Sequence, residues 1–587
     1  MDSKPISEKE KIFLALCFLI IITVLLHIFF LENKFIDGDD LTRVVQNPLI
    51  QNISLAGFVH DISGFMSYHY PPFIMTYFWG IIFSVWDLNH IGFHFISFLM
   101  HAVCTGLLFL LLVRITDKIM PAFIASLLFG LHPVHCETVN WISRQDMILS
   151  VLLGLAYLHV ALRKGIFSQI VSTFFLLVAI FISPICFLFI FGEYLITRDR
   201  ERQVIWWKRS LIPAAGLLVV WGREFSLISL KSIFTIAPKA VLYLLQSVFM
   251  PWKIHFMLPI LSPRLNLFCV VSLFLILVLG VVTMKTRSRV WGTAWLALVS
   301  AWLFHSYSER FNSGLMYIPL FWIAMCLGFY LAEIEINSAK LKWVVSISFL
   351  TIFTLCFYLS YERNQTWKNT DSLLKDALAV SPSDAWLLST LGHYKAAFLN
   401  RKETEEIFKQ IKQETCESLC LKAKAQHLLL NTKGSYELFK KLFQEYPLKK
   451  KDKYCLFDFA VLHIQTARQQ DAKKLFYNVT QIDPYFIYAW HDLGTLFIRE
   501  KNGENGLKYL KKVLTIAPAY RPTLENIAFY YMKRKDYRKA LYYIRRALKS
   551  TSCHDTQRFY KGWLKKLKEQ KPFRFASLQW ADLKPPG

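Results

Sequence analysis

The first polar loop of the chain carries three carboxylates that can do chemistry: Asp37, Asp39 and Asp40. The loop follows the first strongly apolar segment, at roughly 12–30, so these acids lie beside a membrane surface. Acidic side chains within or near a bilayer are costly and often functional. A carboxylate placed there can accept a proton from an attacking hydroxyl. We therefore regard Asp39 and Asp40 as candidate catalytic residues, against the simpler interpretation of a solvated loop start.

Two further polar clusters follow apolar segments that end on the same predicted side of the membrane. The stretch 131–146 combines histidines, acids and an arginine; its candidate residues are His132, His135, Glu137, Arg144 and Asp146. The stretch 308–319 contains Glu309 and Arg310, and the long loop between the two clusters contains Arg223. Arginine binds phosphate through paired N–H donors, and a nearby carboxylate can accept a proton. Together these side chains predict a site for a lipid-phosphate substrate.

We assign the residues of these clusters different roles. Glu137 is the candidate second acid, and three arginines are candidates for binding the phosphate of such a substrate: Arg144, Arg310 and Arg223. Asp146 is placed to orient Arg144. Four side chains, His132, His135, Asp146 and Glu309, are expected to support the site. If arginines neutralise the phosphate, the site needs no metal and no cofactor.

The pair His132 and His135 has a spacing that can hold a metal on a helix. Pro133 between them argues for a helix break, and no third ligand is evident. A structural or hydrogen-bonding role is therefore favoured. The eleven cysteines contain no CxxC pair, so neither a zinc site nor a thioredoxin-like site is indicated. A disulfide among the cysteines of the C-terminal half remains open if that half lies in an oxidising compartment.

Apolar segments long enough to position these loops occur throughout the part of the chain that ends near position 360. A helix that crosses a bilayer needs about 20 apolar residues. Eleven candidates are present: 12–31, 92–113, 119–135, 147–162, 168–184, 185–197, 210–222, 265–284, 290–305, 314–333 and 342–360. The first is interpreted as an uncleaved span. The proline-led stretch 71–86 is interpreted as a surface-lying or re-entrant helix.

Charge placement predicts the orientation of these spans. Lys and Arg gather in the short loops on one side, which the positive-inside rule makes cytoplasmic. The N-terminus is then cytoplasmic, and the acid-rich loop and everything after 361 lie on the opposite, periplasmic or lumenal side. The chain as a whole is 54% hydrophobic with a net charge of +26, of which +19 falls after residue 361. A basic half tied to a membrane suggests anionic lipid as a neighbour, and no nucleic-acid motif is present.

The C-terminal half shows a helical repeat. Pro484 and Pro518 each end one amphipathic run and begin another, and their separation of about 34 residues equals the tetratricopeptide period. Trp490 with Leu493-Gly494 matches the W-x-x-L-G pattern of the same repeats. Trp386 with Leu391-Gly392 is a looser copy. We predict about five stacked helix pairs forming a solenoid with a surface for extended ligands.

In combination, these motifs resemble a known family, the membrane glycosyltransferases of the GT-C superfamily that carry C-terminal tetratricopeptide repeats. These include the eukaryotic transmembrane O-mannosyltransferases and bacterial relatives. The matching residues occur in order: Asp39-Asp40 with Asn47-Pro48, the stretch from His132 to Asp146, Glu309-Arg310 with Tyr317 and Pro319, and Arg363-Asn364 with Trp367. Two motifs depart from the family: Tyr68-His-Tyr-Pro-Pro72 has no Arg, and Ser183-Pro184-Ile185 has no Lys-Glu.

The resemblance implies an all-α chain, with a GT-C-like membrane domain of about eleven spans at 1–360, a repeat domain at 361–570 and a tail at 571–587. It implies an integral, multi-pass protein of a bacterial inner membrane or the endoplasmic reticulum. Its activity would be an inverting transfer of a sugar from a polyprenyl-phosphate donor to a hydroxyl of a protein or glycan, with the repeats holding the acceptor. Two alternatives stay open: a repeat scaffold whose transferase site has decayed, which the departures favour, and a lipid-linked glycan ligase or flippase.

Overall fold

The computed structural model describes residues 6–47, 49–50, 73–197, 237–254, 258–259, 267–286, 288–305, 310–311, 313–335, 338–446, 453–500, 503–549 and 554–568. It is predominantly helical, as predicted, and the described strands are one antiparallel pair, β1 (Leu258–Pro259) with β2 (Arg310–Phe311). The described residues fall into two compact units. The first holds those up to 47 and from 74 to 415, and the second consists mainly of those from 416 on.

The apolar helices of the first unit follow the predicted segments. Ten of the eleven segments lie on described helices, and 210–222 lies outside the described residues. The helices are α1 (Glu8–Ile28), α4 (His90–Thr116), α5 (Ile119–Leu131), α7 (Gln145–Ala161), α8 (Ile166–Ile182), α9 (Leu188–Ile196), α13 (Leu267–Thr286), α14 (Arg289–His305), α15 (Tyr317–Glu333) and α16 (Ala339–Thr366). The stretch 71–86 contains α3 (Phe73–Trp86), and α12 (Ala237–Phe249) precedes α13. Four helical segments are long and apolar enough to cross a membrane: Glu8–Ile28, His90–Thr116, Ser313–Glu333 and Ala339–Thr366.

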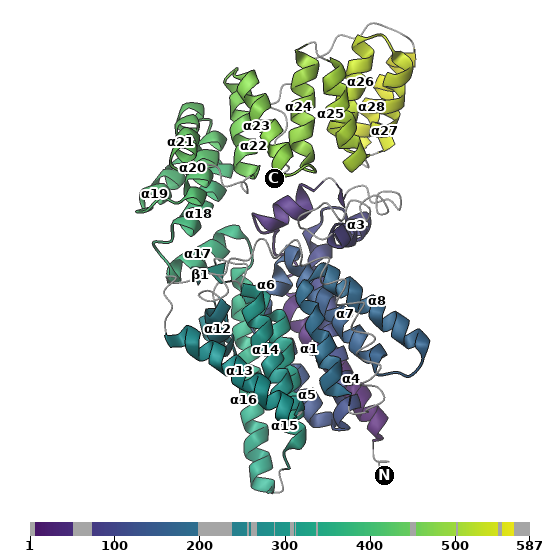
Figure 1. Cartoon of the computed structure of the whole chain (residues 1–587), viewed down its shortest axis with the longest axis vertical. Helices are drawn as coiled ribbons and strands as arrows, with labels where there is room; N and C mark the ends of the chain where they lie inside the picture. The colour runs from purple at the N-terminus through teal and green to yellow at the C-terminus, as the bar shows by residue number, and fades with distance from the viewer. Residues whose placement is uncertain are drawn as a thin grey trace. The chain divides into compact units, whose positions relative to one another are not determined.

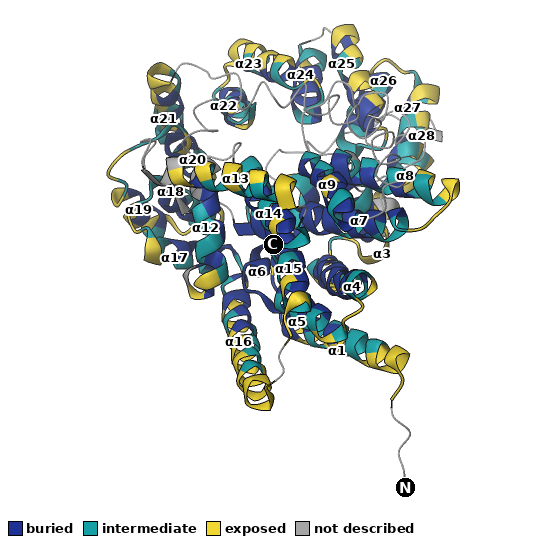
Figure 2. Cartoon of the chain, turned by 60° about the horizontal axis from the view of Figure 1, so that its bottom comes forward, coloured by how far each residue is buried: buried dark blue, intermediate teal, exposed yellow. Residues whose placement is uncertain are grey.

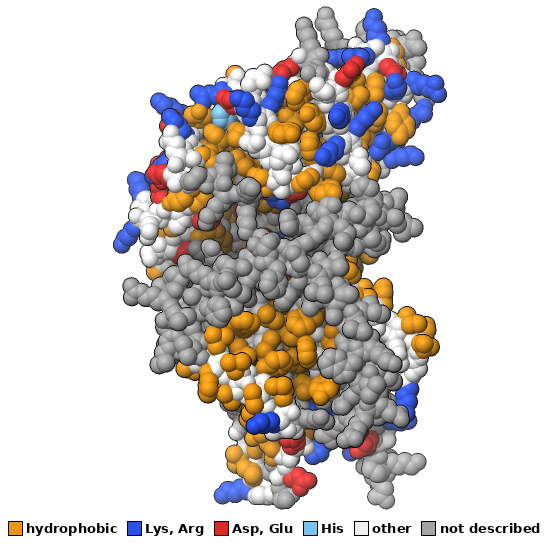
Figure 3. Space-filling model, in the orientation of Figure 1, with side chains coloured by type: hydrophobic (Ala, Val, Ile, Leu, Met, Phe, Trp, Pro, Cys, Tyr) orange, Lys and Arg blue, Asp and Glu red, His pale blue; other side chains and the backbone are white. Residues whose placement is uncertain are grey.

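These four helical segments differ in how far they are buried within the protein (Figure 2). In the most apolar stretch of each segment, 67% of the residues of α4 and 61% of those in the segment containing α15 are buried. The share falls to 22% in α1 and to 11% in α16. The central helices therefore pack against protein, and the outer ones present residues such as Trp343 and Leu350 outward. An exposed apolar surface of this kind fits lipid contact, and Figure 3 shows hydrophobic side chains over much of one face of this unit.

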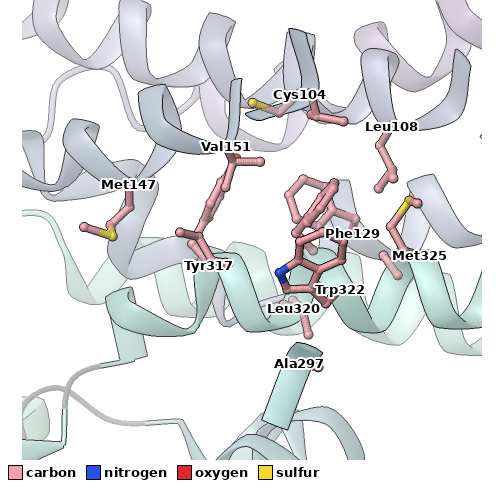
Figure 4. Packing of buried hydrophobic residues seen from close by; sticks show 14 of the residues in the cluster. Cys104, Leu108, Phe129, Met147, Val151, Ala297, Tyr317, Leu320, Trp322 and Met325 are labelled. Atoms are coloured by element: carbon pink, nitrogen blue, oxygen red, sulfur yellow. The ribbon is translucent and has the colours of Figure 1, made fainter. Parts of the chain in front are cut away.

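The core of the first unit lies between α4, α5, α7 and α15. Phe129, Tyr317 and Trp322 are fully buried there, among Leu108 and Val151 (Figure 4). Gly192 on α9 allows the ring of Trp322 to approach closely, because a Cβ at that position would lie 2.4 Å from the ring. This dense packing fixes the ends of the helices, and hence the loops that leave them.

The repeat helices begin directly after α16. Three of them, α17 (Thr370–Val380), α18 (Ala385–Ala397) and α19 (Arg401–Lys409), belong to the first unit. The predicted domain boundary at 360/361 lies inside α16. The second unit contains α20 (Cys416–Leu428), α21 (Thr432–Glu445), α22 (Lys453–Gln465), α23 (Gln469–Ile482), α24 (Ile487–Arg499), α25 (Gly503–Ile516), α26 (Arg521–Lys533), α27 (Tyr537–Lys549) and α28 (His554–Lys568).

Helix pairs repeat at the predicted interval. The first helices of three successive pairs, α22, α24 and α26, begin at Lys453, Ile487 and Arg521, and both steps equal the repeat period of about 34 residues. Gly494 on α24 meets α25 closely, since a Cβ there would lie 2.9 Å from Leu510 and 3.0 Å from the carbonyl oxygen of Gly506.

The looser copy of the repeat pattern has the same kind of contact, because Gly392 on α18 faces the ring of Phe408 on α19. A disulfide between Cys420 and Cys455 joins α20 to α22. The pairing falls within the C-terminal half, where the sequence left a disulfide open.

Candidate active site

The carboxylate of Asp40 is completely buried and holds two parts of the chain together. One oxygen accepts a hydrogen bond from the backbone N–H of Ile36 at 3.0 Å, and the other accepts one from the backbone N–H of Ser143 at 2.7 Å. Burial raises the pKa of Asp40 to about 7, although both backbone hydrogen bonds act to lower it. Asp40 therefore connects the first loop by a hydrogen bond to the short helix η3 (Ile142–Arg144), which precedes α7.

Asp39, its neighbour, is placed differently. About 35% of its side chain is exposed, and it lies 3.3 Å from the guanidinium of Arg43, one turn further along the loop. Its carboxylate thus stays accessible, while that of Asp40 is used in backbone hydrogen bonds. The sequence pattern did not separate these two adjacent acids; the structure distinguishes them by burial.

Glu137 lies in the short helix α6 (His135–Asn140) and is 2% exposed. Ser313, at the start of η7 (Ser313–Met316), donates its hydroxyl to one carboxylate oxygen. The other oxygen has no hydrogen-bond partner within the described part of the chain. Burial raises the pKa of Glu137, opposed by hydrogen bonds from Ser313 and Gly314 and by the charges of Arg144 and Arg363. A buried acid of this kind favours its protonated form more than an ordinary glutamate does.

Arg144 is the next residue after Ser143, whose backbone N–H donates to Asp40. Its guanidinium lies over the ring of Trp141, 4.9 Å from the ring centre. Its Nε is buried and has no hydrogen-bond partner among the residues that the structure describes. A buried N–H without a partner is costly, which favours an anionic ligand at this position. Asp146 is also buried and accepts a hydrogen bond from the backbone N–H of Met147 at 2.8 Å, at the start of α7.

The two histidines lie where α5 gives way to α6, and Pro133 separates the helices as expected. His132 accepts a hydrogen bond from the backbone N–H of Val134 at 3.3 Å. The ring of His135 packs edge-on against Phe129 and Tyr317, with ring centres 4.6 Å apart in both cases. Among the described residues, no group of three His, Cys, Asp or Glu side chains is arranged to hold a metal. In this geometry both histidines contribute to packing.

Three predicted site residues have no described side chain. Arg223 and Glu309 lie outside the described residues, and Arg310 is described only by its backbone, which pairs with Pro259 in the strand pair β1–β2. Their predicted roles therefore stay predictions.

Arg363 joins the site, although we assigned it no role from the sequence. It lies in the last turn of α16, and its Nη1 is 2.5 Å from Asp376 on α17. Its Nη2 is buried without a hydrogen-bond partner among the described residues, and its charge acts on Glu137. The motif Arg363-Asn364…Trp367 was one of those that carry the family resemblance, but nothing in the sequence indicated that Arg363 lies near Glu137.

A network of amide side chains connects the same segments. Asn33 donates a hydrogen bond to Asn140 at 3.0 Å, and Asn140 donates one to Asn364 at 2.5 Å. Trp141 and Trp367 lie alongside, with ring centres 6.1 Å apart. The first loop, α6 and the end of α16 are thus locked together. With Ser313 of η7, which donates to Glu137, the site consists of residues from four segments that are far apart in the sequence.

Known proteins resemble this chain at the level of sequence. The chain is 24% identical over 396 residues to a Caenorhabditis elegans protein named protein O-mannosyl-transferase F38B6.6, an alignment that covers 60% of this chain and 56% of that protein. It is 29% identical over 175 residues to the human protein O-mannosyl-transferase TMTC1, which covers 26% of this chain and 19% of that protein. The chain thus spans at most about half the length of these relatives. No protein-family model matches it.

Solved structures of other proteins also resemble part of the chain. One is YrrB, described as a tetratricopeptide-repeat protein with an unusual peptide-binding site, at 11% identity and a TM-score of 0.27, covering 32% of this chain and 97% of that one. Another is pilF of Pseudomonas aeruginosa, at 14% identity and a TM-score of 0.30, covering 36% and 92%. By sequence, the chain is a homologue of proteins named protein O-mannosyl-transferase, as its motifs predict, and it carries tetratricopeptide repeats.

Proposed function

We propose that the chain is a membrane glycosyltransferase that moves a sugar, mannose in the first instance, from a polyprenyl-phosphate donor to a hydroxyl of a protein acceptor. Two observations support the proposal: Asp40 of the first loop is hydrogen-bonded to Ser143, the residue before Arg144, and the charges of Arg144 and Arg363 both act on the buried Glu137. The names of the two relatives support the sugar and the protein acceptor. A glycan acceptor is the second possibility from the sequence.

Within this proposal, Asp39 is the general base. Asp40 is completely buried and engaged by two backbone N–H groups, so no acceptor hydroxyl reaches it without breaking those bonds. Asp39 keeps an accessible carboxylate on the same loop. It takes the proton of the acceptor hydroxyl as the hydroxyl oxygen attacks the anomeric carbon. The bond from that carbon to the phosphate oxygen breaks, the lipid phosphate leaves, and the configuration of the sugar inverts.

Arg144 and Arg363 hold the donor phosphate. Each has a buried guanidinium nitrogen with no hydrogen-bond partner among the described residues, and the charges of both act on Glu137. A phosphate satisfies such donors through charge-assisted hydrogen bonds. Because its pKa is raised, Glu137 is more readily protonated than an ordinary glutamate. A protonated Glu137 does not repel the donor phosphate, and it can donate a hydrogen bond to the leaving oxygen. Arg310 and Arg223 remain further candidates for the same role.

Asp40 is then a positioning residue. Its hydrogen bond to the backbone of Ser143 sets the place of Arg144, the next residue, relative to the first loop and Asp39. Such a link holds base and phosphate-binding group at a fixed separation, which a displacement reaction requires.

The same proposal includes the sidedness of the protein. The acid-rich loop and the repeats lie on the periplasmic or lumenal side, where a lipid-linked sugar and a protein acceptor can meet. The repeats then hold the acceptor, and anionic headgroups neighbour the basic C-terminal half. The bias of Lys and Arg towards the opposite loops supports this orientation.

The test is transfer of labelled mannose from a synthetic polyprenyl-phosphate donor by the full chain in liposomes, with a protein rich in Ser and Thr as acceptor. We expect label on acceptor hydroxyls. A lack of transfer with mannose and every other donor sugar would contradict the proposal and favour the scaffold without activity. Movement of the labelled donor across the bilayer without transfer would instead favour a flippase.

A further inference from the structure

A recess in the second unit lies apart from the site described above. It has a volume of about 590 Å³ and is lined by side chains of α25, of the end of α26 and of the start of α27. Four cations line it: Lys508, Lys511, Arg534 and Lys539. In Figure 3, Lys and Arg side chains are prominent over the part of this unit where Figure 1 labels α25 to α28.

The cations come from two different walls. Lys508 and Lys511 lie one helical turn apart on α25, and both are exposed. Arg534 and Lys539 belong to the connection between α26 and α27 and to the first turn of α27. No ion pair of Lys508 or Lys511 is found among the described residues. The recess therefore has a positive charge on both sides.

Two tyrosines hold one wall in place. Arg534 lies over the ring of Tyr530 and Lys539 over the ring of Tyr531, each 5.2 Å from the ring centre. Tyr530 and Tyr531 are 7% and 9% exposed, so they are anchored in the core of the unit. Cation–π contacts of this kind reduce the freedom of the cations before any ligand arrives.

The acids of the recess compensate this charge only in part. Glu504 lies 3.9 Å from Arg534, and Asp536 lies 3.0 Å from Lys539. Both pairs are largely exposed, and exposed ion pairs contribute little stability. An incoming carboxylate can therefore replace either resident acid at low cost. The charge balance selects an anionic ligand.

We propose that this recess binds an acidic polypeptide segment in an extended conformation. Successive side chains of an extended chain point in opposite directions, so alternate carboxylates reach the two cationic walls. A flat bilayer surface reaches the rim of a recess but not both of its walls, and a single phosphate is small for a volume of about 590 Å³. Binding of this kind does not require the proposed transferase activity.

The experiment measures binding of the full chain in detergent to a short fluorescent peptide of consecutive Glu residues, which presents carboxylates on both sides of an extended chain. Binding is followed by anisotropy at low salt, where charges are least screened. The variant is Lys508→Gln/Lys511→Gln, which removes two exposed charges from one wall. The matched control is Lys561→Gln/Lys565→Gln, which removes two exposed charges from α28 outside the recess. We expect the first variant to weaken binding by about tenfold or more and the control by less than about threefold. A Gln peptide of the same length should bind neither the parent nor the variants.

Three results would overturn the proposal. Equal weakening in both double variants would mean that the peptide senses only the net charge. Equal competition by inorganic phosphate and by the peptide, at equal charge concentration, would indicate a simple anion site. Binding of mixed phosphatidylcholine–phosphatidylserine vesicles that depends on Lys508 and Lys511, without peptide binding, would assign the recess to the membrane surface. Arg534→Gln/Lys539→Gln on the other wall provides an independent repeat of the first measurement.

Discussion

The carboxylate of Asp40 and the backbone N–H of Ser143 are joined by a 2.7 Å hydrogen bond, although the two residues are 103 positions apart in the sequence. Through this bond, the loop that carries Asp39 is fixed to the turn that carries Arg144. The accessible acid Asp39 and the partly unpaired Arg144 are each the sequence neighbour of a residue in this bond. The predictions below test this arrangement, the orientation of the chain and the packing of its repeats.

The contact between α24 and α25 depends on a glycine. Gly494→Val adds a branched side chain where even a Cβ would lie 2.9 Å from Leu510 and 3.0 Å from the carbonyl oxygen of Gly506. We expect a loss of about 1–3 kcal/mol in the local stability of this repeat. Hydrogen exchange of the α24 amides measures it. The control is Gly562→Ala on α28, where a Cβ meets nothing within 4 Å; protection unchanged by both substitutions would contradict the predicted packing.

The contribution of Asp492 on α24 to the stability of the second unit should decrease as pH rises from about 4 to about 7. Burial raises its pKa to about 7, so the folded state binds a proton that the unfolded state has already lost. The stability that this proton contributes is complete below the unfolded pKa near 3.8 and is lost as pH passes through 7. The adjacent His491, whose pKa burial lowers to about 4, acts in the opposite direction between 4 and 6.5.

The difference between the parent and Asp492→Asn isolates Asp492 from His491. Hydrogen exchange of α24, corrected for intrinsic rates, should show that the variant gains relative to the parent as pH rises from 4 to 7. A difference that stays constant across that range would show that Asp492 titrates normally in the fold.

The orientation of the chain is testable by cysteine labelling at two exposed positions. Asn505→Cys lies in the repeats, predicted outside, and Glu335→Cys lies between α15 and α16, predicted inside. In sealed vesicles with the extracytoplasmic face outward, an impermeant thiol reagent should label position 505 above the parental background and leave 335 unlabelled. Reaction of position 505 only after the membrane is opened would reverse the orientation.

Donor affinity should depend on Arg144 and Arg363. Removing a charge-assisted hydrogen bond to phosphate costs about 1.5–3 kcal/mol, so Arg144→Ala and Arg363→Ala should each weaken donor binding by at least about tenfold. Asp376→Ala is the control, because it removes the carboxylate that lies 2.5 Å from Arg363 while keeping the guanidinium. Binding measured with a non-transferable donor analogue decides the matter. Equal loss in Arg363→Ala and Asp376→Ala would mean that Arg363 acts only through α17.

The repeats were predictable from the sequence because their signals are local. Trp490 and Gly494 carry the repeat pattern within one helix, and Pro484 and Pro518 mark the repeat interval. The apolar segments were predictable for the same reason, since length and hydropathy define a helix that can cross a membrane.

The assembly of the site was less predictable. Asp40 bonds to a backbone N–H, and any residue at position 143 other than proline supplies that donor, so the sequence bears no mark of it. Asp39 and Asp40 are identical in type, and only burial separates their roles. Arg363 reaches Glu137 through the packing of α16 beside α6, a long-range relationship that spacing in the chain does not encode.

The most direct test of the proposed mechanism compares the two adjacent acids of the first loop. Asp39→Asn removes the accessible carboxylate, Arg43→Gln removes only its ion-pair partner, and Asp40→Asn disturbs the buried link to Ser143. Transfer rate and donor affinity are measured for each variant with the same polyprenyl-phosphate sugar.

We predict that Asp39→Asn lowers kcat by about 10²–10⁴-fold with donor affinity unchanged. Arg43→Gln should keep a kcat within about threefold of that of the parent. Asp40→Asn should lower both the donor affinity and the stability of the protein. Full activity in Asp39→Asn would contradict the account and move the base to Glu137.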